Sequence, residues 1–200
     1  MKPIPLHDFS AEDSLLLIQN MIHKAKQEIS DQSFYFLLWG WSAFFGCIGQ
    51  FVLKVFFEYE HHYIVWLITI PCLIITVYNS IRRSKERKVK TYVNTSMNYL
   101  WIGMGICFLV LWLLFVKLGW FNCYPFFILL YGLGAFTSGK FLQFTPFVVG
   151  GVLSWCLAVV AIWFSFDYQA LFAAAALLFT HIIPGHLLQK ARSVSPIQKL

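Results

Sequence analysis

Long apolar runs separated by short polar connections constrain this chain more than any other feature of its sequence. A transmembrane helix needs about 20 apolar residues to cross roughly 30 Å of hydrocarbon. A monomer with so many apolar runs would not be soluble in water, since 59% of its residues are hydrophobic and only 12% are charged. We therefore predict an all-α integral membrane protein, a helical bundle. Its six predicted transmembrane helices cover residues 34–57, 63–81, 97–116, 122–138, 144–166 and 169–188.

The connections divide the chain into an N-terminal segment of residues 1–33, a six-span domain of residues 34–188 and a basic tail of residues 189–200. Because 200 residues hold six spans only if the connections are short, we expect successive spans to pair as three hairpins. The N-terminal segment lacks the long apolar run of a signal peptide. Its apolar residues instead recur at helical spacing over residues 10–30, which predicts an amphipathic helix in the cytoplasm or at the membrane interface.

Lysine and arginine are distributed unevenly between the two sides of the predicted bundle. Thirteen of the fifteen fall on the side of the termini, and six of these lie in the connection after the second span. The positive-inside rule places this side in the cytoplasm. We therefore expect both termini to be cytoplasmic and the basic connection to contact anionic lipids. Membrane topology accounts for the net charge of +6, and no nucleic-acid-binding module is present in the sequence.

Few polar residues lie where chemistry could occur. Four potential metal ligands follow the first span, but their spacing matches no metal signature and hydrated interfacial residues explain them more simply. Four polar residues within the spans could form an intramembrane site, although hydrogen bonds between helices explain them as well. We find no catalytic or nucleotide-binding motif, so an enzyme is the least favoured class and no cofactor is expected. The potential metal ligands are Glu58, Glu60, His61 and His62, and the intramembrane residues are Gln50, Thr137, Thr180 and His181.

Two classes of function remain open. The first is a non-enzymatic docking or regulatory role, in which the amphipathic helix and the basic connection bind a cytoplasmic regulator or another membrane subunit. The apolar stripe of that helix could equally lie on lipid headgroups. The second is a small-solute transporter or channel that acts as a homo-oligomer and uses the intramembrane polar residues. The predicted docking face contains Ile18, Met21, Ile22, Arg82, Arg83, Lys85, Arg87 and Lys88.

Turn and packing motifs occur in both halves of the chain. In the second half they are the segment from Tyr131 to Pro146, Gly150-Gly151 with Ser154-Trp155, and the segment from Ile183 to Leu188. In the first half, Leu37-Leu-Trp-Gly-Trp41 follows the amphipathic helix. These motifs resemble a family of small bacterial inner-membrane proteins whose function is not assigned. The resemblance implies the six-span architecture and the bacterial cytoplasmic membrane, and it supplies no catalytic or binding residue.

Overall fold

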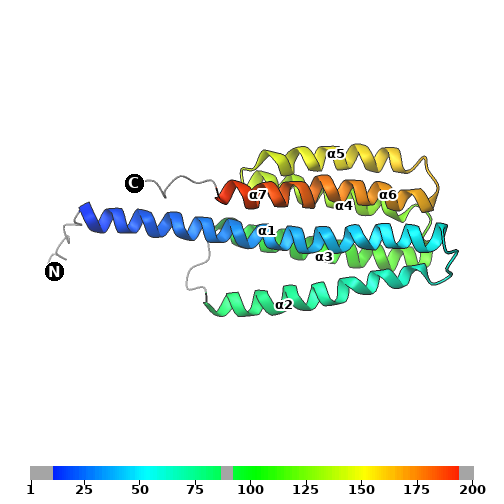
Figure 1. The fold of residues 1–200 in the computed structure, drawn as a ribbon, viewed down its shortest axis with the longest axis horizontal. Coiled ribbons are helices and arrows are strands. Elements are labelled where there is room, and N and C mark those ends of the chain that lie inside the picture. Colours follow the sequence, from blue (N-terminus) through cyan, green and yellow to red (C-terminus); the bar gives the residue numbers. More distant parts are fainter. Residues whose placement is uncertain (1–10, 87–91, 194–200) are drawn as a thin grey trace.

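The computed structural model describes residues 11–86 and 92–193, and these residues form a helical bundle that contains no strand. Successive helical rods run in alternating directions, with α6, η2 and α7 continuing one another as a single rod (Figure 1). We call the end of the bundle where α1 begins and α7 ends the terminal end, and the opposite end the far end. The elements are α1 (Ala11–Val55), the 3₁₀ segment η1 (His62–Ile68), α2 (Thr69–Glu86), α3 (Tyr92–Leu118), α4 (Cys123–Phe141), α5 (Thr145–Ala161), α6 (Phe166–Leu177), the π-helical segment η2 (Leu178–Ile182) and α7 (Ile183–Ser193).

Four segments of the structure are long and apolar enough to cross a membrane, namely Ser33–Val55, His62–Arg82, Thr95–Leu118 and Phe166–Ala191. The prediction of an all-helical chain is therefore confirmed, and the helices are compatible with a membrane protein. α5 is also apolar but has only 17 residues. α4 has 19 residues and ends with Lys140 in its last turn, which lowers its apolar character. The count of six spans in three hairpins stays a prediction.

The N-terminal segment and the first predicted span are one helix in the structure. α1 runs for 45 residues without interruption, and its first part extends beyond the bundle at the terminal end (Figure 1). No glycine or proline separates the amphipathic pattern from the apolar run that follows it. Nothing in the local sequence therefore ends the helix where the composition changes.

The second predicted span differs from a single α-helix. Its first seven residues form η1, and the α-helix α2 begins at Thr69. Pro71, which is inside the predicted span of residues 63–81, lies in the first turn of α2. A proline is tolerated there because the first amide groups of a helix have no partner within it. The irregularity of this span is therefore the change from 3₁₀ to α-helix, two residues before the proline.

Small residues let α4 and α5 approach until their backbones touch. A Cβ atom on Gly132 would lie 2.9 Å from the carbonyl oxygen of Gly151, and one on Gly151 would lie 2.7 Å from that of Gly132. Ser154 is fully buried and donates a 2.9 Å hydrogen bond to the carbonyl oxygen of Ile128 in α4. Small residues of α5 thus make the close contact with α4.

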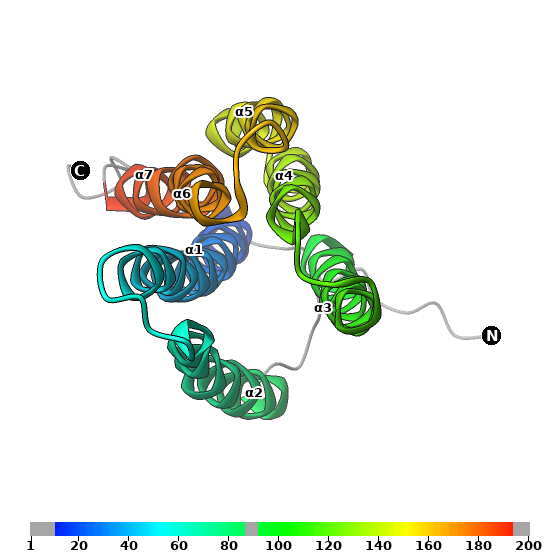
Figure 2. The same cartoon turned by 90° about the vertical axis from the view of Figure 1, so that its right-hand side faces the viewer.

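α2 and α3 lie at the two edges of the bundle, as the end-on view shows (Figure 2). In their apolar windows only 6% and 11% of residues are buried, compared with 39% for the window in α1 and 56% for the window in the last rod. α1 packs mainly against the last rod, which consists of α6, η2 and α7. The core is therefore built around α1, α4, α5 and the last rod, and the outward faces of α2 and α3 are apolar.

Candidate functional site

His181 lies at the centre of the bundle, in the π-helical segment η2. It is 2% exposed, and three aromatic rings surround it. The ring centroids of Phe36 in α1 and Tyr131 in α4 are each 5.6 Å from that of His181, and the centroid of Trp101 in α3 is 5.9 Å away. Four rods thus meet at this one side chain.

The hydrogen bonds around Thr180 define which nitrogen of His181 carries a proton. The Thr180 hydroxyl donates its single proton to the carbonyl oxygen of Ala176, at 2.7 Å. Its oxygen also lies 2.8 Å from Nδ1 of His181, so at this contact the oxygen must accept. Nδ1 therefore carries hydrogen, and in the neutral ring Nε2 keeps its lone pair. The bond to Ala176 also fixes the Thr180 side chain along the helix axis.

Two glycines make room for η2. A Cβ atom on Gly40 of α1 would lie 2.7 Å from Cβ of His181, and one on Gly150 of α5 would overlap the carbonyl oxygen of Phe179. π-helical segments are rare and occur frequently at functional sites. Here the widened turn is packed between α1 and α5, with no space for even a methyl group on either side.

Gln50 organises a second polar cluster, nearer the far end. Its side chain is 5% exposed, and its Oε1 accepts hydrogen bonds from the indole nitrogen of Trp66 at 2.5 Å and from the hydroxyl of Tyr124 at 2.7 Å. These residues belong to α1, η1 and α4. One buried amide oxygen therefore joins three elements, as expected for a polar group that must find its partners inside the protein.

An ion pair and an amide pair connect the loops of the far end. Lys54 at the end of α1 lies 2.5 Å from Asp167 at the start of α6, and its ammonium group is 4.4 Å from the centroid of the Phe166 ring. Gln169 donates to Oδ1 of Asn122 at 2.6 Å and to the carbonyl oxygen of Phe164. Lys54 lies near the end of the first predicted span and Asp167 lies between the last two, at the same predicted membrane surface. That shared position is the signal in the sequence for their pairing.

The structure separates the predicted intramembrane residues. Gly40 contacts His181, and Gln50 lies ten residues further along α1, which is about 15 Å at 1.5 Å per residue. Thr180 and His181 are adjacent and hydrogen-bonded, whereas Thr137 is a half-buried residue of α4. Gln50 and His181 are thus parts of two clusters.

The four potential metal ligands lie at the far end, in and beside the loop after α1. Glu58, Glu60 and His61 are exposed, and His62 is half-buried. Nδ1 of His61 forms a 2.9 Å hydrogen bond with the hydroxyl of Tyr63. Within residues 11–86 and 92–193, no three His, Cys, Asp or Glu side chains come close enough together to hold a metal ion. The four residues therefore do not converge on one point.

The predicted docking face lies largely outside what the structure describes. Ile18, Met21 and Ile22 are on the projecting part of α1, where the backbone but not the side chains is described. Arg82 is exposed near the end of α2. The side chains of Arg83 and Lys85 are outside the described set, and Arg87 and Lys88 are outside the described residues.

Comparison of the chain with family models, with curated proteins and with solved structures gave no match. The resemblance to small bacterial inner-membrane proteins therefore stays a prediction. The function is argued below from the geometry of the chain itself.

Proposed function

We propose that this chain is a six-span protein of the bacterial cytoplasmic membrane that docks a protein partner through the projecting part of α1. The role is non-enzymatic, and the partner is a cytoplasmic regulator or another membrane subunit. The observation that carries the proposal is the continuity of α1 from Ala11 to Val55.

A continuous α1 favours a protein partner over the lipid surface. The membrane-spanning part of α1 begins at Ser33, so the 22 preceding residues extend about 33 Å further along the same axis. A helix that lies flat on headgroups has to turn by a large angle before it enters the bilayer. α1 makes no such turn, so its stripe of Ile18, Met21 and Ile22 is carried away from the headgroups. A second helix can cover such a stripe.

The alternating directions of the helices support six membrane crossings. α4 and α5 pack along each other and alternate in direction with α3 and α6 (Figure 1). Their connections would then lie on opposite membrane surfaces. With six crossings, the projecting part of α1 and the basic connection of residues 82–90 are both cytoplasmic, as the positive-inside rule requires.

The second candidate function, a small-solute transporter or channel formed by an oligomer, receives less support. It needs a polar path across the bundle. Gln50 and His181 lie about 15 Å apart along α1. Each is hydrogen-bonded within the bundle and lies against aromatic side chains, which suits a packing role.

A crosslinking pull-down from native membranes tests the docking proposal. The intact protein is compared with a variant whose stripe carries Ile18→Asp and Ile22→Asp. The matched control carries Asn20→Asp and Gln27→Asp, which lie on the opposite side of an ideal helix of 100° per residue. We expect a specific protein that is recovered with the intact chain and the control and lost from the stripe variant.

Recovery of the same proteins with all three chains would contradict the docking proposal. Recovery of lipids and copies of the chain alone, again with all three, would also contradict it and favour transport. Because the two variants change the charge equally, a loss confined to the stripe variant cannot be attributed to charge.

A further inference from the structure

The stripe on the projecting part of α1 shares a helix face with residues that α1 buries in the bundle. Steps of three, four or seven residues keep positions on one face of a helix with 3.6 residues per turn. Such steps connect Ile18, Ile22, Ala25, Ile29, Phe36 and Gly40. Phe36 and Gly40 are buried, and α1 is one uninterrupted helix. The stripe is therefore the continuation of the buried face of α1 beyond the end of the bundle.

Within the bundle, this face of α1 is directed toward α5 and the last rod. The ring centroid of Phe36 lies 4.3 Å from that of Phe147 near the start of α5, and Gly40 contacts His181. The projecting part of α1 continues along the same axis (Figure 1). Outside the bundle, the stripe is therefore directed over the terminal ends of α5 and α7.

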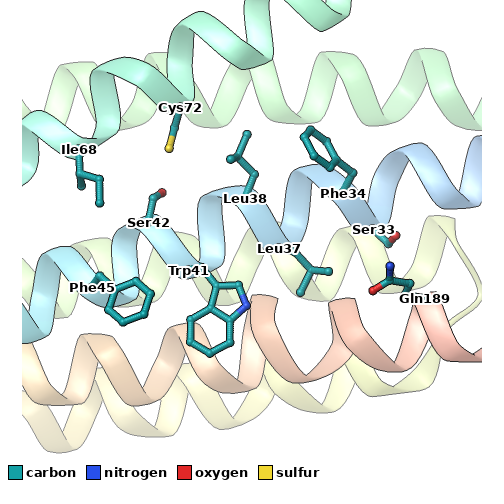
Figure 3. Close-up of a pocket in the computed structure, with 10 residues that line it drawn as sticks. All are labelled: Ser33, Phe34, Leu37, Leu38, Trp41, Ser42, Phe45, Ile68, Cys72 and Gln189. Carbon is teal, nitrogen blue, oxygen red and sulfur yellow. The ribbon is translucent and has the colours of Figure 1, made fainter.

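α7 lies beside α1 only up to the base of the projecting part. A Cβ atom on Gly185 would lie 2.9 Å from the side chain of Leu37, and four residues further along α7 Gln189 lies beside Ser33 (Figure 3). α7 ends after four more residues, which brings its last turn level with Ile29. Among the described residues, no other helix runs beside α1 beyond that level (Figure 1). The stripe thus begins where the neighbouring helices of the bundle end.

The α4–α5 connection, residues 142–144, lies at the foot of the stripe. Gln143 precedes Phe147 by four residues, so it lies roughly 6 Å nearer the terminal end than the contact of Phe147 with Phe36. The connection is thus level with the point where α1 leaves the bundle, and Gln143 is exposed there. We call the stripe and this connection together the corner surface.

The corner surface is separate from the groove on the outer side of α1. Phe34, Leu38 and Phe45 line that groove, between the start of α2 and the end of α7 (Figure 3). At 100° per residue, these three positions lie about 160° to 200° around the helix from Ile18. A partner that follows the stripe therefore reaches the α4–α5 connection and not the groove.

The terminal end of the molecule carries an excess of positive charge. Its side of the predicted topology holds thirteen of the fifteen Lys and Arg residues and six of the nine Asp and Glu residues, a net charge of +7. Lys140 is exposed in the last turn of α4, three residues before Gln143. Positive charge at a binding surface favours a partner with acidic groups and speeds its approach.

On the basis of the docking role proposed above, we infer that the partner binds the corner surface with an acidic amphipathic helix. The apolar face of that helix packs on Ile18 and Ile22, beyond the end of α7. Its acidic residues lie toward Lys140, and one end of the helix rests on Gln143. The partner thus contacts two parts of the chain that are far apart in the sequence.

Photocrosslinking from single positions of the full chain in native membranes tests this placement. A benzophenone-bearing phenylalanine replaces Ile22 on the stripe or Gln143 on the connection. The controls are Asn20, on the opposite face of α1, and Ser80, an exposed residue near the terminal end of α2. We expect the same protein to be crosslinked from Ile22 and Gln143, and not from Asn20 or Ser80.

Mapping the crosslinked peptides by mass spectrometry tests the chemistry of the partner. Ile22 precedes Phe36 by fourteen residues, about 21 Å, so Ile22 and Gln143 are separated by roughly 15 Å along α1. The two crosslinked sites should therefore lie about ten residues apart in one helix of the partner. That helix should carry an apolar stripe and several Asp or Glu residues.

A charge reversal at an exposed position tests the acidic character of the partner. Lys140→Glu should lower crosslinking from Ile22 about fivefold, because it replaces an attraction with a repulsion. The matched control is Lys117→Glu, an exposed residue in the last turn of α3 at the far end, which should leave crosslinking unchanged. Equal crosslinking in both variants would refute an acidic partner.

The crosslinks separate failure of the placement from failure of the docking role. A protein crosslinked from Ile22 but not from Gln143, or equally from Ser80, would refute the corner surface and leave docking through α1 intact. Lipid alone, or copies of this chain alone, crosslinked from Ile22 would refute both. Two different proteins crosslinked from Ile22 and Gln143 would refute a single helix that covers both.

Discussion

Replacing Gly150 with alanine tests the packing of η2 most directly. The added methyl group would overlap the carbonyl oxygen of Phe179, far inside the 3.0 Å that real Cβ atoms keep. A backbone oxygen cannot rotate away as a side chain can. α5 and the last rod would therefore have to separate. Gly103 in α3 is the matched control, because no atom lies within 4 Å of the position that its Cβ would occupy.

The two substitutions should have opposite effects on the free energy of unfolding. Overpacking typically costs 1 to 3 kcal/mol, and a backbone clash belongs at the upper end, so we expect a loss of about 3 kcal/mol for Gly150→Ala. Gly103→Ala meets no obstacle and reduces the entropy of the unfolded chain, for a gain of roughly 0.5 to 1 kcal/mol. The variants should thus differ by about 4 kcal/mol, on the order of a thousandfold in the ratio of folded to unfolded protein.

Reversible unfolding in mixed micelles, with dodecyl sulfate as denaturant and circular dichroism as signal, measures both values. The close contact of α5 with η2 would be refuted if the free energy of unfolding of Gly150→Ala lay within about 0.5 kcal/mol of the value for the original chain. An equal loss in both variants would show that any added methyl group disturbs the bundle. In that case the clash at Phe179 would not be the cause.

Two further predictions concern the buried polar clusters. Gln50→Leu removes the acceptor for Trp66 and Tyr124 and should lower the free energy of unfolding by about 1 to 2 kcal/mol in the same titration. The control Gln143→Leu, at an exposed position, should lower it by less than about 0.5 kcal/mol. Equal losses would show that the two hydrogen bonds contribute nothing to stability. Thr180→Val removes the acceptor for Nδ1 of His181, so the tautomer protonated at Nε2 should become more populated. Nitrogen NMR of protein labelled at histidine measures this population. An unchanged spectrum would contradict the assigned tautomer.

The sequence located most helices because their ends are marked locally. The fourth span was predicted to begin at residue 122, and α4 begins at Cys123, directly after Asn122 in a left-handed conformation. Pro146 similarly marks the start of α5. The change in composition near residue 33 is different, because a polar stretch and an apolar stretch can belong to one helix when no residue interrupts the backbone hydrogen bonds. Composition alone could not predict that α1 continues through it.

The clusters could not be predicted because their members come from different rods. The sequence identified Gln50 and His181 as buried polar residues, but hydropathy does not indicate which helices are neighbours. Periodicity places His181 on one face of the last rod, yet the rings that enclose it come from α1, α3 and α4. The π-helical turn at η2 is also invisible to a 3.6-residue period, because it adds one residue to a single turn.

The unbroken α1 helix makes the bundle sensitive to torsion. A rotation of 20° about its axis, imposed at the projecting end, would move side-chain tips about 5 Å from the axis by roughly 1.7 Å. At Gly40 the helix surface lies directly against His181, because even a methyl group there would meet the Cβ atom of the histidine. A twist of α1 that reaches Gly40 therefore acts on the η2 turn, which carries this buried ring.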